Sequence, residues 1–271
     1  RWDRASRRIQ RIGHILDLFS DLEDTLFQAG RKCQAAQDGT APELLPAAYG
    51  GDGNPLSFML PGRRALFSLA DERMRVVPIT ARNLDSFRRV RLPFRHGAIL
   101  NYGATILKPD GGEDTVWREK TLALLKAAEP MLHEAMALMR SVIRNDGLSS
   151  TARLIGDPAS GIPFYALSKN PDRNAAQLQR IREELERDFR PATPWRLHHN
   201  DNNLAVIPAC LGKAVAVDHF IRTWIAEPRD GFMTLGTGDS IEDINFMNLC
   251  EYAIIPSQSQ IARRRLEPGA T

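Results

Sequence analysis

Four short segments of the chain carry side chains that together could support phosphoryl transfer. Transfer from a phosphate ester requires a nucleophile, groups that take up the charge of the phosphoryl oxygens, and a proton donor for the leaving group. Carboxylate, hydroxyl and ammonium groups can fill these roles, and all of them occur in these segments. The segments are Asp21-Leu22-Glu23-Asp24-Thr25, Thr80, Lys213 and Gly238-Asp239-Ser240-Ile241-Glu242-Asp243.

Asp21 is the candidate nucleophile, because a carboxylate can attack phosphorus and form an aspartyl phosphate that water later hydrolyses. Glu23, two residues further on, is the candidate general acid and base. Thr80 offers a hydroxyl group and Lys213 an ammonium group to the phosphoryl oxygens, where they would stabilise the charge of the transition state. The predicted catalytic residues are therefore Asp21, Glu23, Thr80 and Lys213.

The same segments predict a Mg²⁺ site. Mg²⁺ prefers an octahedral shell of oxygen ligands and retains several waters. Asp21, the backbone carbonyl of Glu23 and Asp239 could bind the ion together with a substrate oxygen. Asp243 lies one helical turn after Asp239 and would support the site. Mg²⁺ is thus the cofactor that the sequence predicts.

Each segment also has a purely structural interpretation. Asp and Thr after a strand are common in turns and helix caps. Gly238-Asp239-Ser240 could simply cap a helix that begins near Ile241. Taken alone, Thr80 is typical of a strand end and Lys213 of a solvated helix start. The order and spacing of all four segments favour a shared phosphoryl site over four unrelated caps.

The apolar pattern places these segments at the ends of strands or the starts of helices. Strands are predicted over 14–20, 74–79, 232–235 and 253–255, and helices over 63–72, 212–224 and 241–249. Strands that alternate with helices predict an α/β fold with a doubly wound, mostly parallel sheet. Such sheets bind ligands at the carboxyl ends of their strands, where Asp21 and Thr80 are expected to lie.

A smaller α/β domain is predicted as an insert over residues 111–204. Its expected elements are a helix over 113–144, strands over 153–156 and 163–168, a helix over 174–189, and strands over 195–199 and 204–207. The catalytic core would then consist of residues 1–110 and 205–271. The segment 29–62, rich in Gly, Pro, Gln and Ala, predicts an irregular excursion from this core.

Composition and charge exclude several classes of protein. The chain has 271 residues, of which 43% are hydrophobic, so it can bury a sizeable core. The net charge of +3 is too small to indicate nucleic-acid binding, and the five arginines among the first twelve residues predict a solvated face or tail. No apolar run approaches the roughly 18 to 20 residues that span a bilayer.

Cysteine usage favours a reducing compartment. Cys33, Cys210 and Cys250 lack the CxxC spacing of a zinc site, and their odd number disfavours a disulfide framework. No signal-peptide apolar segment is present, although the missing initiator Met is compatible with a lost leader. We therefore expect a cytoplasmic protein that acts on a small phosphorylated molecule, with no nucleic-acid or membrane partner.

At the four segments the chain resembles the haloacid dehalogenase superfamily, whose first motif is an Asp-x-Asp-x-Thr loop after a strand. The resemblance covers the whole chain apart from its first dozen residues. The matching sequences are Phe19-Ser20-Asp21-Leu22-Glu23-Asp24-Thr25-Leu26, Ile79-Thr80-Ala81-Arg82, Gly212-Lys213 and Gly236-Thr237-Gly238-Asp239-Ser240-Ile241-Glu242-Asp243. The last of these motifs is the most specific.

The insert between the second and third motifs is similar to the α/β cap of the sugar-phosphatase branch. That branch includes phosphatases of sucrose phosphate, mannosylglycerate phosphate and trehalose phosphate, as well as phosphomannomutases. The resemblance implies a phosphate monoester hydrolase whose cap selects a sugar phosphate or a related polyol phosphate. Arg82, Asn83, Lys169 and His198 are the expected substrate contacts. His198 and His199 should face opposite sides of a strand and therefore not share a metal.

The first motif departs from the family pattern, which has Asp where this chain has Glu23 and Gly where it has Asp24. The extra methylene moves the acid by roughly one bond, and a misplacement of about 1 Å can cost on the order of a hundredfold in rate. Two alternatives to a full phosphatase therefore stay open. One is a phosphomutase of the phosphomannomutase type, and the other is a catalytically weak, phosphate-binding pseudoenzyme.

Overall fold

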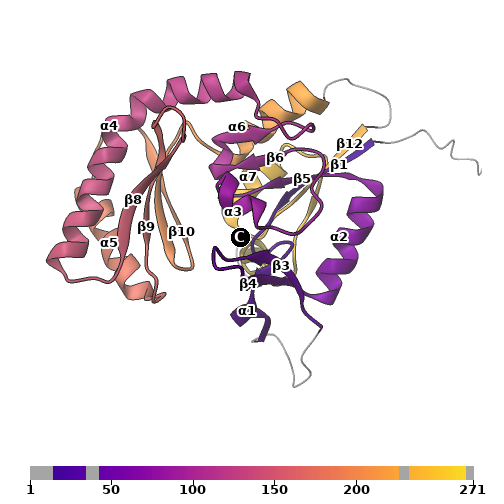
Figure 1. Cartoon of the computed structure of the whole chain (residues 1–271), viewed down its shortest axis with the longest axis horizontal. Coiled ribbons are helices and arrows are strands. Elements are labelled where there is room, and N and C mark those ends of the chain that lie inside the picture. The colour runs from indigo at the N-terminus through magenta and orange to yellow at the C-terminus, as the bar shows by residue number, and fades with distance from the viewer. Residues whose placement is uncertain (1–14, 35–42, 226–231, 267–271) are drawn as a thin grey trace, which may run out of the picture. The chain divides into compact units, whose positions relative to one another are not determined.

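The computed structural model describes residues 15–34, 43–225 and 232–266 of the chain (Figure 1). These residues form two compact units, one from the described residues up to Asp114 and from Lys213 onward, and the other from Thr115–Gly212. Both divisions lie later in the chain than the predicted boundaries after residues 110 and 204. Strand β11 (Asn203–Pro208) pairs with two strands of the second unit, which keeps it out of the core. The arginine-rich start, predicted to be solvated, lies outside the described residues.

The first unit is built on a six-stranded sheet with the order β13-β12-β1-β5-β6-β7. All neighbouring strands are parallel except β6 and β7, so the predicted doubly wound, mostly parallel sheet is confirmed. The strands are β1 (Ile15–Asp21), β5 (Arg75–Ile79), β6 (Ala98–Leu100), β7 (Thr105–Leu107), β12 (Phe232–Thr237) and β13 (Tyr252–Ile254).

Helices cover both faces of this sheet. The helices of the first unit are α1 (Gly30–Gln34), α2 (Pro61–Arg73), α3 (Leu84–Arg88), η2 (Asn101–Gly103), α6 (Lys213–Phe220), η3 (Ile221–Ile225), η4 (Ile241–Asp243), α7 (Ile244–Met247) and α8 (Gln260–Leu266). Leu18 of β1 packs in the same cluster as Phe67 of α2. The next residue, Phe19, meets Phe220 of α6 edge to face, with ring centroids 5.9 Å apart. Burial on both faces explains the nearly continuous apolar run of β1.

One charged residue interrupts that run. Asp17 is buried, and it lies directly opposite Arg75 on the neighbouring strand β5. The Arg75 guanidinium donates to the Asp17 carboxylate at 2.6 Å. The pair satisfies a carboxylate that would otherwise be costly to bury, and it accounts for an acid in the middle of a core strand.

The prediction of an irregular excursion over 29–62 is wrong for the described part of that segment. A three-stranded antiparallel sheet forms there, with β4 between β2 and β3. Its strands are β2 (Gln28–Ala29), β3 (Leu45–Tyr49) and β4 (Pro55–Met59). The Gly50–Asn54 turn closes the β3–β4 hairpin through a 2.8 Å hydrogen bond from the Gly50 amide to the Asn54 carbonyl. Pairing with β4 overrode the weak strand propensity of Leu45-Pro46-Ala47-Ala48-Tyr49.

The second unit is a four-stranded antiparallel sheet with helices on one face (Figure 1). Its elements are α4 (Thr115–Asn145), β8 (Thr151–Gly156), β9 (Pro163–Lys169), α5 (Ala175–Asp188), β10 (Trp195–Asn200) and β11. Leu132 and Ala135 of α4 and Ile181 of α5 pack with Ala166 and Val206 of the sheet. The predicted order of helix, two strands, helix and two strands is therefore confirmed.

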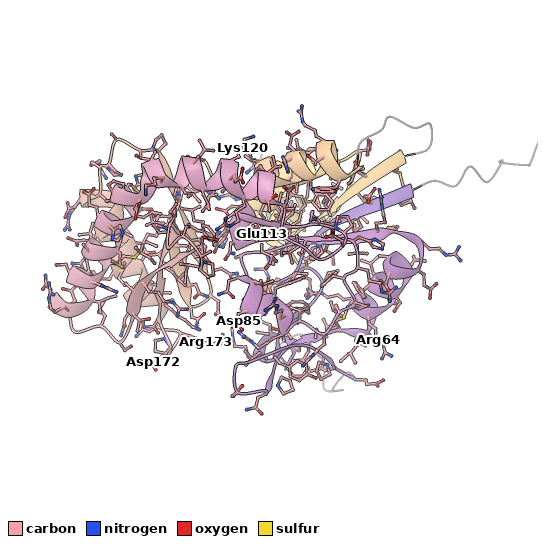
Figure 2. The ribbon with its side chains drawn as sticks, turned by 45° about the horizontal axis from the view of Figure 1, so that its top comes forward. Arg64, Asp85, Glu113, Lys120, Asp172 and Arg173 are labelled. Carbon is pink, nitrogen blue, oxygen red and sulfur yellow. The ribbon has the colours of Figure 1, made fainter. Side chains whose placement is uncertain are left out.

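Polar residues define the ends and the outer face of these helices. The Asn174 side chain accepts hydrogen bonds from the Ala176 and Gln177 amides and caps the start of α5. Lys120 is exposed on α4, and its ammonium lies over the Trp117 ring (Figure 2).

No helix among the described residues is both long enough and apolar enough to cross a membrane.

Candidate active site

The parallel sheet brings three of the four predicted segments to one edge. Asp21 is the last residue of β1 and lies opposite Ile79, so Thr80 follows directly on the next strand. On the other side of β1, Ser20 lies opposite Thr237, and Gly238 follows. The strand ends therefore place the first, second and fourth motifs side by side, as a parallel sheet requires.

Lys213 joins two of these motifs. It is the first residue of α6, and its Nζ lies 2.5 Å from Oδ1 of Asp21 and 2.7 Å from Oδ1 of Asp243. The Lys213 side chain is only 13% exposed, and those of Asp21 and Asp243 are 8% and 1% exposed. A single buried ammonium group thus bridges the candidate nucleophile and the fourth motif.

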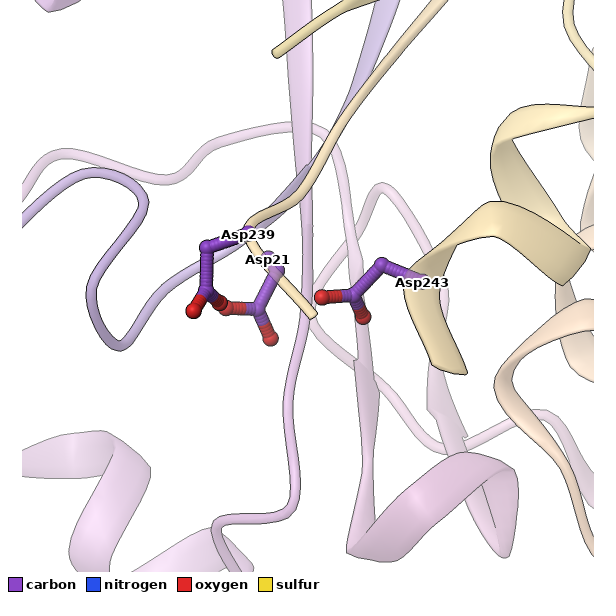
Figure 3. Close-up of side chains that lie close together, drawn as sticks. All are labelled: Asp21, Asp239 and Asp243. Atoms are coloured by element: carbon purple, nitrogen blue, oxygen red, sulfur yellow. The ribbon is translucent and has the colours of Figure 1, made fainter. Parts of the chain in front are cut away.

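Three carboxylates converge beside this ammonium. Asp21, Asp239 and Asp243 each place one oxygen within 4.8 Å of the others, and their side chains point toward one another (Figure 3). Asp243 is already engaged through both oxygens, because Oδ2 also accepts from the Ser240 amide at 3.0 Å and from the Ser240 hydroxyl at 2.7 Å. Asp21 is likewise engaged at both oxygens, at Oδ1 by Lys213 and at Oδ2 by the Thr25 hydroxyl.

On balance, burial and charge repulsion oppose ionisation of Asp21 and Asp239 but not of Asp243. Burial raises the pKa of Asp21 well above its usual range; Lys213 opposes this shift and the neighbouring carboxylates add to it. Burial also raises the pKa of Asp239 to about 6. Against the effect of burial, contacts with Lys213 and Ser240 lower the pKa of Asp243. Burial likewise disfavours the charge on Lys213, but Asp21 and Asp243 raise its pKa above the usual value.

The fourth motif folds through contacts within itself. Ser240 and Asp243 form a capping box at the start of η4, in which each side chain bonds the other's backbone amide. Gly238 is packed so closely against Asp243 that an added Cβ would lie 2.4 Å from the Asp243 Cβ. Only glycine fits this position without a shift of the loop.

The first motif, in contrast, takes partners from other elements. Thr80 donates its hydroxyl to Oε2 of Glu23 at 3.2 Å, and the Arg82 Nε lies 2.5 Å from Oε1 of the same carboxylate. Asp24 adopts a left-handed backbone conformation with φ of 61° and forms an ion pair with Lys32 of α1. The Thr25 hydroxyl donates to Oδ2 of Asp21 at 3.3 Å.

The four expected substrate contacts have different surroundings. Arg82 is engaged with Glu23, and the Asn83 side chain caps α3 by accepting from the Ser86 amide at 2.9 Å. Lys169 and His198 belong to the second unit, where strand register places both on the sheet face opposite α4 and α5. Their role as substrate contacts stays a prediction.

Two residues next to the site were missed by the sequence analysis. Asn101 and Tyr102 have φ of 53° and 57°, a conformation that costs energy in residues other than glycine. Their amides donate to the Arg82 carbonyl at 2.9 Å and to the Thr80 carbonyl at 3.2 Å. Nothing in the sequence tied these two residues to the second motif.

Solved structures of other proteins share this architecture. The C-terminal domain of trehalose-6-phosphate phosphatase from C. albicans is 14% identical, with a TM-score of 0.50 over 87% of this chain and 73% of that chain. A protein from Eubacterium rectale is also 14% identical, with a TM-score of 0.51 over 91% and 89% of the two chains. The sucrose-phosphatase of Synechocystis, at 16% identity, covers 95% and 89% with a TM-score of 0.48.

The chain shares its fold with these solved structures, including the C. albicans phosphatase domain. The core sheet with an inserted α/β unit between the second and third motifs is the arrangement expected from the motifs. No protein-family model and no curated protein sequence matches the chain. At 14% identity the similarity establishes the fold, so the activity has to be argued from the site residues.

Proposed function

We propose that the chain is a Mg²⁺-dependent phosphate monoester hydrolase that acts through an aspartyl phosphate on Asp21. The observation that carries the proposal is the convergence at one sheet edge of Asp21, the bridging ammonium of Lys213, and the Asp239 and Asp243 carboxylates. This set supplies a nucleophile and a fixed positive charge in a largely buried site, where electrostatic interactions are stronger than in water.

Asp21 attacks phosphorus in the first step, and its oxygen forms the new bond while the alcohol leaves. Lys213, held by Asp243, neutralises charge on the nucleophile and on the phosphoryl oxygens. The Thr80 hydroxyl hydrogen-bonds the phosphoryl group. The protonated form of Glu23 gives its proton to the leaving alcohol; the resulting carboxylate takes a proton from the water that hydrolyses the aspartyl phosphate, which restores the acid. Lys213 and Asp243 thereby keep Asp21 in place through both steps.

The donor set fits Mg²⁺. Carboxylate oxygens are hard ligands, and three of them lie within 4.8 Å of one another. The raised pKa values of Asp21 and Asp239 reflect burial to which mutual repulsion adds, and a divalent cation would relieve that repulsion. Asp21, Asp239 and the Glu23 carbonyl would hold the ion, with Asp243 in support. When bound, Mg²⁺ would supply charge stabilisation for the phosphoryl oxygens.

The proposed substrates are phosphate monoesters of sugars or related polyols. Trehalose-6-phosphate phosphatase and sucrose-phosphatase are among the structures similar to this chain. Of the substrate contacts expected from the sequence, Asn83, Lys169 and His198 remain proposed contacts, whereas Arg82 is engaged with Glu23. The proposal includes a cytoplasmic location and a small-molecule phosphorylated partner.

The test is phosphate release from a panel of sugar, polyol and nucleotide monophosphates with and without Mg²⁺. Wild-type turnover should require Mg²⁺ and should disappear in Asp21→Asn, which keeps the shape of the side chain but removes its nucleophilic oxygen. Asp85→Asn is the matched control. It makes the same change of charge on α3, at a side chain that is 79% exposed. Full activity is expected in this control.

Other outcomes would separate the proposal from its two rivals. Binding of inorganic phosphate without turnover on any panel member would contradict hydrolysis and favour a pseudoenzyme. Phosphate transfer between positions of a sugar, stimulated by a sugar bisphosphate, would favour a phosphomutase. Turnover that persists in Asp21→Asn would rule out Asp21 as the nucleophile.

A further inference from the structure

The Glu23 carboxylate is held at both of its oxygens. Oε1 lies 2.5 Å from the Arg82 Nε, and Oε2 accepts from the Thr80 hydroxyl at 3.2 Å. The ion pair is partly protected from water, because the Arg82 side chain is 19% exposed and that of Glu23 is 33% exposed. A glutamate side chain has one more rotatable bond than an aspartate, so these two contacts remove a freedom that aspartate would not have.

Arg82 is in turn fixed from several sides. A second nitrogen of its guanidinium donates to the Ser86 carbonyl at 3.1 Å, and the guanidinium carbon lies 5.5 Å from the centre of the Phe27 ring. Phe27 also forms a backbone bridge with Glu23 itself. Arg82 is therefore oriented by the same loop that carries the acid, and its planar fork suits such a multiple contact better than lysine would.

The backbone beneath this arrangement is equally constrained. The Arg82 amide donates to the Thr80 hydroxyl oxygen at 3.1 Å, and its carbonyl accepts from the Asn101 amide at 2.9 Å. The Thr80 carbonyl accepts from the Tyr102 amide at 3.2 Å. Asn101 and Tyr102 both adopt the left-handed conformation, which is retained only where surrounding contacts compensate for its cost. The Thr80–Arg82 segment is thus a rigid support.

From these contacts we infer that Arg82 is a positioning residue for Glu23 rather than a contact to substrate. This inference rests on the proposed hydrolysis at Asp21. The arginine holds a longer acid at the point where the reaction needs a carboxyl group, and it does so from the segment that also presents Thr80. Together the two contacts compensate for the extra methylene of Glu23.

The contacts of Arg82 distinguish this role from substrate binding. The Glu23 carboxylate and the Ser86 carbonyl occupy its Nε and one terminal nitrogen, and the ring of Phe27 packs against it. Its Nε–H and one terminal N–H are already committed to protein acceptors, and both contacts fix the orientation of Glu23 relative to the loop. Removal of Arg82 should therefore slow the chemical steps and leave the affinity for substrate nearly unchanged.

A double-mutant cycle with Arg82→Gln and Glu23→Gln tests the inference, with 4-nitrophenyl phosphate and Mg²⁺ as the assay. We expect Arg82→Gln to lower kcat on the order of a hundredfold, the cost of a misplaced catalytic group, with KM changed by less than about twofold. In the Glu23→Gln background the same substitution should change kcat by less than about twofold, because its target is already absent.

Controls separate this role from folding and from the proposed function. Arg88→Gln alters an exposed arginine on α3, the helix that Asp85 marks in Figure 2, and should leave kcat unchanged. Arg82→Lys keeps the positive charge, and its kcat should lie between those of Arg82→Gln and the wild type. It replaces Arg82→Gln in the test if that variant proves unstable on heating. If the wild type turns over, two results would overturn the positioning role alone. One is a raised KM with normal kcat in Arg82→Gln, and the other is a double variant whose loss of kcat is the product of the two single losses. Absence of wild-type turnover would overturn the hydrolase proposal itself.

Discussion

The first and fourth motif loops lie side by side at the same sheet edge but are stabilised in different ways. The fourth loop forms a capping box from its own Ser240 and Asp243 and packs closely at Gly238, and it also forms hydrogen bonds with Gln260 and Ile261. The first loop departs from the family pattern at Glu23 and Asp24, and each of these acids pairs with a basic residue outside the loop. The acids of the first loop thus pair with side chains of α1 and of the segment after β5, whereas the fourth loop forms its capping box from its own residues.

Lys213 connects the two loops, so its removal should have the largest effect on both. In Lys213→Met, the Asp21 and Asp243 carboxylates lose the ammonium that lies 2.5 and 2.7 Å away. Loss of one partner from a buried ion pair costs about 3–5 kcal/mol, and turnover should fall below detection. Chemical denaturation of the metal-free protein measures the first effect. If stability were unchanged, the two loops would not depend on their shared cation.

A substitution within the fourth loop should test its internal packing. Gly238→Ala places a Cβ 2.4 Å from the Cβ of Asp243. Such overpacking costs about 1–3 kcal/mol, and it should also weaken Mg²⁺ binding because Asp239 is the next residue. Gly62→Ala is the control, since a Cβ there meets nothing within 4 Å; its expected change is within about 0.5 kcal/mol. Equal stability of the two variants would contradict the close packing of the fourth loop.

Acidification should weaken Mg²⁺ binding through the fourth loop. The metal requires an ionised carboxylate, and burial raises the pKa of Asp239 to about 6. Apparent affinity should therefore fall as the pH drops through this value, by about tenfold per pH unit below it. The folding stability of the metal-free protein should change in the opposite direction. Asp239 binds its proton more tightly in the folded state than in the unfolded state, so the free energy of unfolding falls as the pH rises from the ordinary pKa range of an aspartate through 6. Calorimetric titration with Mg²⁺ between pH 5 and 8 measures the affinity, and Asp239→Asn is the reference. An affinity of the wild type that does not change with pH would contradict this assignment.

The smallest effect is expected at Asp24 in the first loop. At φ of 61° alanine is strained, so Asp24→Ala should lose about 1–2 kcal/mol relative to Asp24→Gly. Glycine relieves the strain, while the partly exposed ion pair with Lys32 contributes at most about 1 kcal/mol. Thermal unfolding of the two variants provides the comparison. Both variants lack the Lys32 pair, so a glycine variant no more stable than the alanine variant would contradict backbone strain at this position.

Much of the architecture followed from local patterns. The apolar run before Asp21 predicted β1, and the alternation of strands with helices predicted the parallel sheet. The prediction for the segment 29–62 failed, because its strands are short and rich in Ala and Pro. They are stabilised by pairing with one another rather than by their own propensity. The boundary after residue 204 lay too early, because the long-range pairing of β11 with β9 was not encoded in any local signal.

The sequence by itself determined which residue types stand at the strand ends and helix starts, since motif spacing and apolar periodicity are properties of short segments. Only the tertiary structure decided which of these residues meet. Lys213 reaches Asp21 across 192 positions of the chain, and Arg82 reaches Glu23 across 59. Such contacts depend on the register and order of the strands, and pairing between distant segments is set by the packing of the whole core rather than by any local pattern.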